Sequence, residues 1–111
     1  MSRIAPRKSL KTQVYFLNER GKEFLYFISE NISTSGLLIQ SPMPMQAGTK
    51  VFLKFCLFEG DEPIEVAAQA MRFHDKKRGP GRHRRVQTGI GLRFLGLEPQ
   101  DFKRIESFIA S

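Results

Sequence analysis

Apolar and polar residues alternate one by one over several short stretches of this chain, and this pattern limits the folds open to it. In residues 10–16, Leu10, Val14 and Phe16 share one side, and Lys11 and Gln13 stand between them. Successive side chains of a strand point to opposite faces, so a period of two predicts β-strands. The predicted strands cover residues 10–16, 22–29, 37–40, 51–58, 64–74 and 87–95.

One helix is predicted, and it closes the chain. Pro99 suits a first helical position, and Asp101 falls in the opening turn, where an acidic side chain is favourable. A stripe at helical spacing is expected to pack against the strands; it consists of Phe102, Ile105, Phe108 and Ile109. The pattern therefore predicts a mostly β fold, a six-stranded antiparallel split β-barrel with a C-terminal α-helix.

Composition points to a single domain that binds an anion at a defined place. A chain of 111 residues can bury a core of its own. Its net charge of +7 is concentrated in two tracts, residues 1–11 and the loop 76–85, which favours local anion capture over a uniformly basic surface. Neither an apolar run of membrane-spanning length nor a signal peptide is found, so we expect a cytoplasmic protein.

Catalytic and metal-binding chemistry has little support in the sequence. The chain has two histidines and one cysteine, Cys56, which is expected to be a buried, reduced thiol. Paired carboxylates, a nucleophile elbow, a phosphate-binding loop and a zinc-protease motif are all missing. We therefore expect neither an enzyme nor a cofactor-dependent or metal-binding protein.

Two short motifs carry the chemistry that remains. Arg3 and Arg7 supply guanidinium groups, which grip phosphates bidentately and stack on aromatic faces. Asn31 and Ser33 can read the edge of a purine, and Gly36 lacks the side chain that would keep a ligand from the backbone. Such a set suits a compact anion with both phosphates and bases, as in a cyclic dinucleotide.

The two motifs resemble the signature of the PilZ family, RxxxR followed by (D/N)xSxxG, with Asn31 at the position where Asp is commoner. Residues 89–94 are similar to the family's GxGxxF strand, and residues 97–109 to its closing helix. The resemblance implies a small barrel that binds cyclic di-GMP, a bacterial second messenger, without altering it. It also implies a site made of Arg3, Arg7, Asn31, Ser33 and Gly36.

The resemblance leads to further expectations about organisation and output. Residues 1–9 are expected to be a flexible arm that carries RxxxR and folds over the ligand, and residues 10–111 to be the barrel with its helix. Additional candidates for ligand contacts are Lys8, Ser35, Gly91 and Arg93. The liganded surface would be read by a downstream protein partner, in motility, adhesion, biofilm formation or secretion.

Two alternatives stay open at this point. The domain could be an interaction module that docks a partner and binds no nucleotide. It could also be a nucleic-acid-binding barrel that uses the basic loop 76–85. We consider nucleic acid the less favoured partner, because the aromatic and recognition-helix signatures of nucleic-acid binders are missing.

Overall fold

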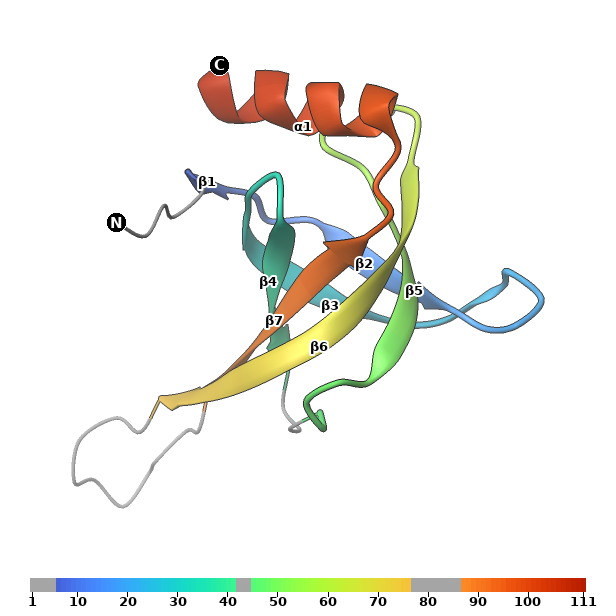
Figure 1. Cartoon of the computed structure of the whole chain (residues 1–111), viewed down its shortest axis with the longest axis vertical. Coiled ribbons are helices and arrows are strands. Elements are labelled where there is room, and N and C mark those ends of the chain that lie inside the picture. The colour runs from blue at the N-terminus through green and yellow to red at the C-terminus, as the bar shows by residue number, and fades with distance from the viewer. Residues whose placement is uncertain (1–5, 42–44, 77–86) are drawn as a thin grey trace.

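A computed structural model describes residues 6–41, 45–76 and 87–111. These residues form strands and a single helix (Figure 1). The strands are β1 (Lys8–Ser9), β2 (Gln13–Leu17), β3 (Glu23–Ile32), β4 (Gly36–Ser41), β5 (Lys50–Phe55), β6 (Ile64–Lys76) and β7 (Gln87–Leu95). The helix, α1, spans Pro99–Ala110.

The strands form one antiparallel sheet that closes on itself. Their order is β1-β3-β2-β5-β6-β7-β4, and β4 also pairs with β3, which completes the ring. The prediction of a mostly β, antiparallel barrel with a C-terminal helix is confirmed, and β2–β7 are its six predicted strands. The seventh strand, β1, comes from the segment predicted as an arm: Lys8 pairs with Ile32, and Ser9 pairs with Asn31.

Five strands differ from their predicted bounds, and β2, β3 and β5 differ most. Strand β2 begins at residue 13 instead of 10, and β5 ends at Phe55 although alternation continues to residue 58. Strand β3 continues beyond the predicted end at Ser29 as far as Ile32. Asn31, beyond the predicted end, therefore lies in a strand, because β1 and β4 pair with β3 on its two sides at this position.

The core lies inside the ring and beneath the helix. Alternate residues of the strands point inward, as the period of two predicted: Val14, Phe16, Leu53 and Phe55 are buried. Phe55 stacks on Phe94 with ring centroids 6.0 Å apart. Cys56 is half-buried instead of buried, and its thiol donates to the Asp61 carbonyl oxygen at 3.4 Å.

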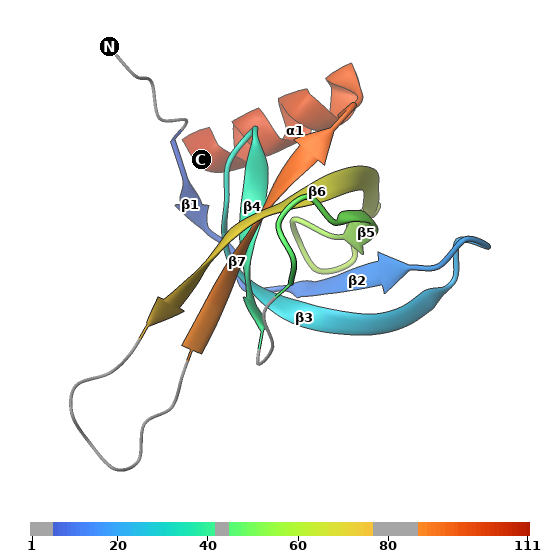
Figure 2. The ribbon, with the colours of Figure 1, turned by 60° about the horizontal axis from the view of Figure 1, so that its bottom comes forward.

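Helix α1 lies across one end of the barrel (Figures 1 and 2). Ile105 and Phe108 are buried, as predicted, whereas Phe102 is 40% exposed, because it lies at the margin of the packed stripe. Arg104 fixes the helix to the loop between β5 and β6: its guanidinium contacts Asp61 in that loop at 2.9 Å, and Asp101 within the helix at 3.2 Å. The hydrogen bond from Arg104 holds the pKa of the Asp61 carboxyl below its usual value.

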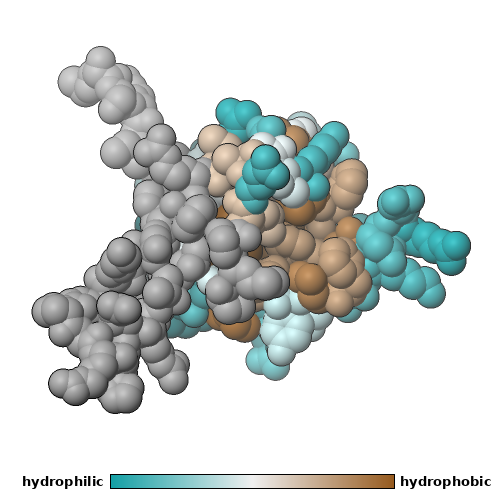
Figure 3. Space-filling model, turned by 90° about the horizontal axis from the view of Figure 1, so that it is seen from below, coloured by the Kyte–Doolittle hydropathy of each residue, from teal (hydrophilic) through white to brown (hydrophobic). Residues whose placement is uncertain are grey.

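Part of the outer surface is apolar. Figure 3 shows apolar residues gathered near the middle of the face seen from below. Strands β3 and β5 contribute large exposed side chains, including Phe24, Tyr26 and Phe52. The described part of the chain has no helix that is long and apolar enough to cross a membrane.

Candidate functional site

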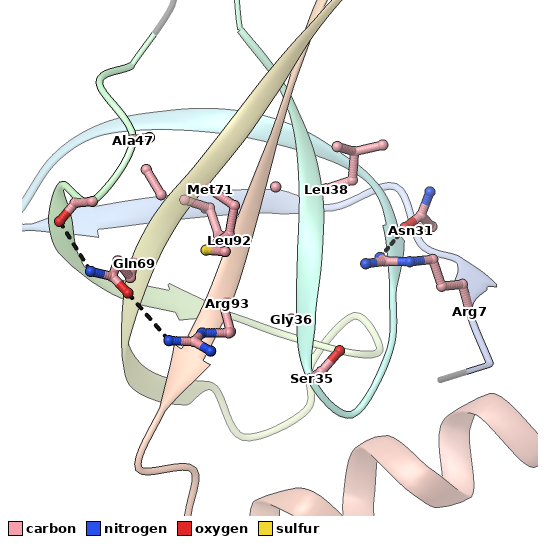
Figure 4. Close-up of a pocket in the computed structure, with 13 residues that line it drawn as sticks. Arg7, Asn31, Ser35, Gly36, Leu38, Ala47, Gln69, Met71, Leu92 and Arg93 are labelled. Carbon is pink, nitrogen blue, oxygen red and sulfur yellow. Dashed lines mark hydrogen bonds between the residues drawn. The ribbon is translucent and has the colours of Figure 1, made fainter. Parts of the chain in front are cut away.

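A cavity of about 800 Å³ lies on the outer side of the sheet, where β4, β7 and β6 run next to one another (Figure 4). Its lining is Arg7, Asn31, Ser35, Gly36, Leu38, Ala47, Gly48, Gln69, Ala70, Met71, Gly91, Leu92 and Arg93. The two lining charges are both positive, and none of the described lining residues is acidic. The cavity therefore favours an anion.

Arg7 and Asn31 form one end of this cavity. The Arg7 guanidinium donates a hydrogen bond of 2.6 Å from Nη1 to Asn31 Oδ1. This contact is possible because β1 pairs with the end of β3 and so brings residue 7 beside residue 31. The resemblance named these two residues as parts of one site, and the structure brings them together 24 positions apart in the chain.

The segment that follows Arg7 is attached to β3 at several points. Leu10 N donates to Glu30 O at 3.1 Å, and Ser29 N donates to Thr12 O at 3.0 Å. The buried Ser29 hydroxyl donates to Leu10 O and accepts from Thr12 N at 3.1 Å. These bonds hold the chain against β3 a few residues after Arg7.

Ser33, Ser35 and Gly36 form the turn between β3 and β4. Ser33 is fully buried, and its hydroxyl accepts a bond of 3.1 Å from Ser35 N and lies 2.8 Å from Ser35 Oγ. Ser33 N also donates to Gly36 O at 2.8 Å. Ser35 and Gly36 line the cavity, whereas Ser33 lies beneath them and holds the turn in shape.

Gly36 lies where two strands approach closely. A Cβ at this position would be 2.1 Å from Leu92 O and 3.0 Å from Arg93 Cα, both backbone atoms of β7. A contact that short cannot occur, so only glycine fits this backbone position. The structure thus accounts for Gly36 by the contact between β4 and β7.

Gly91 behaves differently, although it belongs to the GxGxxF strand. A Cβ there would meet its nearest neighbour, Met71 Cβ, at 3.9 Å, an ordinary van der Waals distance. Close packing, which strand glycines commonly mark, is therefore not the reason for this one. Because Gly91 has no side chain, the space between Leu38 and Met71 at the floor of the cavity stays open.

Arg93 lies in β7 and lines the cavity on the other side of β4 from Arg7 (Figure 4). Its Nη2 donates to Gln69 Oε1 at 3.4 Å, and Gln69 Nε2 donates to Gly48 O at 3.4 Å. Gln69, Met71 and Leu38 were not expected at the site. They belong to no motif, and each is an outward-facing residue of an ordinary strand, so the sequence offered no signal for them.

Three predicted site residues do not line the cavity as described, and Ser33, beneath the turn, is one of them. Arg3 lies outside the described residues, as does most of the basic loop 76–85. Lys8 does not line the cavity; its ammonium group lies against the last turn of α1 instead. Among the described residues there is no cluster of three or more His, Cys, Asp or Glu side chains that could hold a metal ion.

Comparison with protein families identifies the chain. The PilZ domain model matches residues 2–111, nearly the whole sequence. The chain belongs to the PilZ domain family. A search of curated protein sequences finds no match to this PilZ domain.

Solved structures share its fold at low identity. The PilZ domain of Escherichia coli YcgR with c-di-GMP superposes with a TM-score of 0.75 at 16% identity, covering 99% of this chain and 90% of that one. The Bacillus subtilis inhibitor of motility, MotI, gives a TM-score of 0.78 at 18% identity over 99% of this chain and 50% of MotI. The K. pneumoniae MrkH–c-di-GMP complex gives 0.75 at 16% identity, over 99% and 52%. This PilZ domain thus spans about half the length of MotI and of MrkH.

Proposed function

We propose that this PilZ domain is a receptor for cyclic di-GMP, which changes conformation when the ligand binds and so signals to a protein partner. The observation that carries the proposal is the cavity that joins Arg7 and Asn31 to Arg93. It holds two guanidinium groups, an amide and a hydroxyl on an open, partly apolar floor. A ligand with phosphates and flat bases uses every one of these groups.

The proposed contacts follow from the chemistry of each residue. Arg7, with Arg3 from the same motif, binds phosphate and stacks on guanine, as guanidinium groups do. Asn31 accepts from the guanine N–H groups and also orients Arg7 before the ligand arrives. Ser33 and Gly36 shape the turn at this end of the cavity, and Ser35 offers its hydroxyl to the ligand.

The far end of the cavity completes the site. Arg93 is held by Gln69, so its guanidinium is oriented before binding and loses less freedom on contact with an anion. Gly91 and Met71 provide the floor on which a base lies. A volume of about 800 Å³ is within the range of small-molecule sites, which is about 300–1,000 Å³.

The neighbours support a signalling role rather than chemistry on the ligand. YcgR and MrkH are solved with c-di-GMP, and MotI is described as an inhibitor of motility. We infer that this PilZ domain binds the messenger unchanged, in the cytoplasm, and acts as an adaptor in motility or biofilm regulation.

Calorimetric titration with cyclic di-GMP tests the proposal. Arg7→Ala should weaken binding by about tenfold to a hundredfold, the effect of losing a charge-assisted hydrogen bond. Arg20→Ala is the matched control, because Arg20 is an exposed arginine in the turn between β2 and β3, away from the cavity. It should leave the affinity unchanged.

Silence of the wild-type protein at high ligand concentration would refute the receptor and leave the interaction module as the better reading. Equal losses in Arg7→Ala and Arg20→Ala would show that general positive charge, not this cavity, attracts the ligand.

A further inference from the structure

Lys8 connects the N-terminal segment to the far end of the chain. Its ammonium group donates to Phe108 O at 3.0 Å, to Ser111 O at 2.8 Å and to Ser111 Oγ at 2.8 Å. It also lies 4.7 Å from the centroid of the Phe108 ring. All three hydrogen-bonding positions of one ammonium group are therefore used at the carboxyl end of α1.

This contact supplies something that the helix lacks. The last turn of α1 has no basic residue of its own. Among its terminal carbonyl groups, Phe108 O accepts from Ser111 N at 3.3 Å and from the Ser111 hydroxyl at 2.7 Å. A cation at this end interacts favourably with the helix dipole and with those carbonyls. Lys8 provides it from about one hundred residues away in sequence, and Figures 1 and 2 both show β1 beside this end of the helix.

The residue just before this short strand is an arginine that lines the cavity. Arg7 and Lys8 are neighbours, and successive side chains of an extended chain point to opposite sides. Arg7 contacts Asn31 at the cavity, while Lys8 contacts Phe108 at the helix. Strand β1 pairs with β3 through two residues, and Leu10 and Thr12 bond to β3 directly after it. Lys8 adds a second attachment, to the helix.

We propose that Lys8 is a positioning residue that couples occupancy of the cavity at Arg7 to the order of the last turn of α1. The inference rests on the proposed function, since the occupant is cyclic di-GMP. Ligand bound to Arg7 fixes β1, and fixed β1 holds Lys8 on the helix. This coupling is reciprocal. The factor by which the ligand favours the ordered helix end equals the factor by which ordering of that end raises the ligand affinity. The carboxyl end of α1 thereby becomes the part of the surface that reports the bound state.

Hydrogen exchange of the full chain, with and without cyclic di-GMP, tests this coupling in wild type, Lys8→Met and Lys11→Met. Lys11 is an exposed lysine close to Lys8 in the chain and does not contact α1, so Lys11→Met is the matched control. In the ligand-free state, Lys8→Met should raise the amide exchange rate of residues 107–111 about fivefold. The reason is that the substitution removes the cation from the helix end and from the face of the Phe108 ring. Lys11→Met should leave this exchange unchanged.

Ligand should slow the exchange of residues 107–111 in wild type and in Lys11→Met, and this response should vanish in Lys8→Met. The affinity of Lys8→Met for cyclic di-GMP should fall about threefold to tenfold, because binding must then order β1. Lys8→Arg keeps the charge and should therefore retain part of the exchange response and part of the affinity. If Lys8→Met fails to fold, Lys8→Arg replaces it in the comparison.

A fall in affinity with no change in helix exchange would overturn the proposal, because Lys8 would then contact the ligand directly. Unchanged exchange in ligand-free Lys8→Met would overturn the tether itself. If wild type binds no cyclic di-GMP, the receptor and its ligand-driven response both fail, whereas the ligand-free comparison still decides whether Lys8 holds the helix.

Discussion

Gly36 provides the sharpest test of how this site is built. Replacing it by alanine places a methyl carbon 2.1 Å from Leu92 O and 3.0 Å from Arg93 Cα. The nearest atoms are backbone, so no side chain can turn aside to make room. Strands β4 and β7 would have to separate locally by about 1 Å to restore a normal contact. Gly36 is paired with Arg93 in the ladder, so this movement would strain the pairing at the start of β4.

We expect Gly36→Ala to lower the free energy of unfolding by about 3 kcal/mol, at the upper end of the usual cost of overpacking. In a domain of this size, that corresponds to a fall in Tm of about 10–15 °C. Urea unfolding followed by circular dichroism measures the first quantity, and a thermal melt measures the second. Ligand affinity should also fall, because Gly36 and Arg93 both line the cavity.

Gly91→Ala is the matched variant, since its new Cβ would lie 3.9 Å from Met71 Cβ. Its stability should be unchanged or raised by about 0.5 kcal/mol, because glycine is unfavourable within a strand. Its affinity for cyclic di-GMP should nevertheless fall, since the methyl group fills the cavity floor. If Gly36→Ala unfolds like wild type and only binding suffers, the close approach of β4 and β7 is not the reason for this glycine.

Two more perturbations test the loop contact of the helix and the turn. Arg104 holds the pKa of Asp61 below its usual value, so the pair stabilises the fold above about pH 4 and this stabilisation is lost as the pH falls through the lowered pKa. Asp61→Asn should therefore flatten the loss of Tm in acid, and an unchanged acid slope would contradict this. Ser33→Ala should cost about 1–2 kcal/mol in urea unfolding, since Ser33 is buried and bonded to Ser35. Full stability with lost affinity would instead mean that Ser33 contacts the ligand itself.

Much of the barrel could be predicted because it depends on a local signal. Alternation in segments such as residues 10–16 and 51–58 identified the buried sides of β2 and β5, and Val14 and Leu53 are fully buried. Helical spacing identified Ile105 and Phe108 equally well. Strand ends were less predictable, because partner strands decide them: Asn31 is extended since β1 and β4 pair on either side of it.

The candidate site was predictable only where a motif marked it. Arg7 and Asn31 were expected together and do meet. Gln69 and Met71 were not foreseen, because an outward-facing residue joins a cavity only through the strands that happen to neighbour it. The contact of Lys8 with Phe108 is also invisible to local patterns, since it depends on where the helix crosses the closed barrel.

The ring closes where β4 meets β3, and this junction has a consequence for how the protein can be divided. Arg7 and Asn31 lie on the β3 side of β4, and Gly91 and Arg93 lie on its other side, in β7. If the chain is cut before β4, the first fragment keeps Arg7 and Asn31, and the second keeps Gly91 and Arg93. The cavity therefore depends on the closed barrel, and two such fragments would restore it only by reassembling.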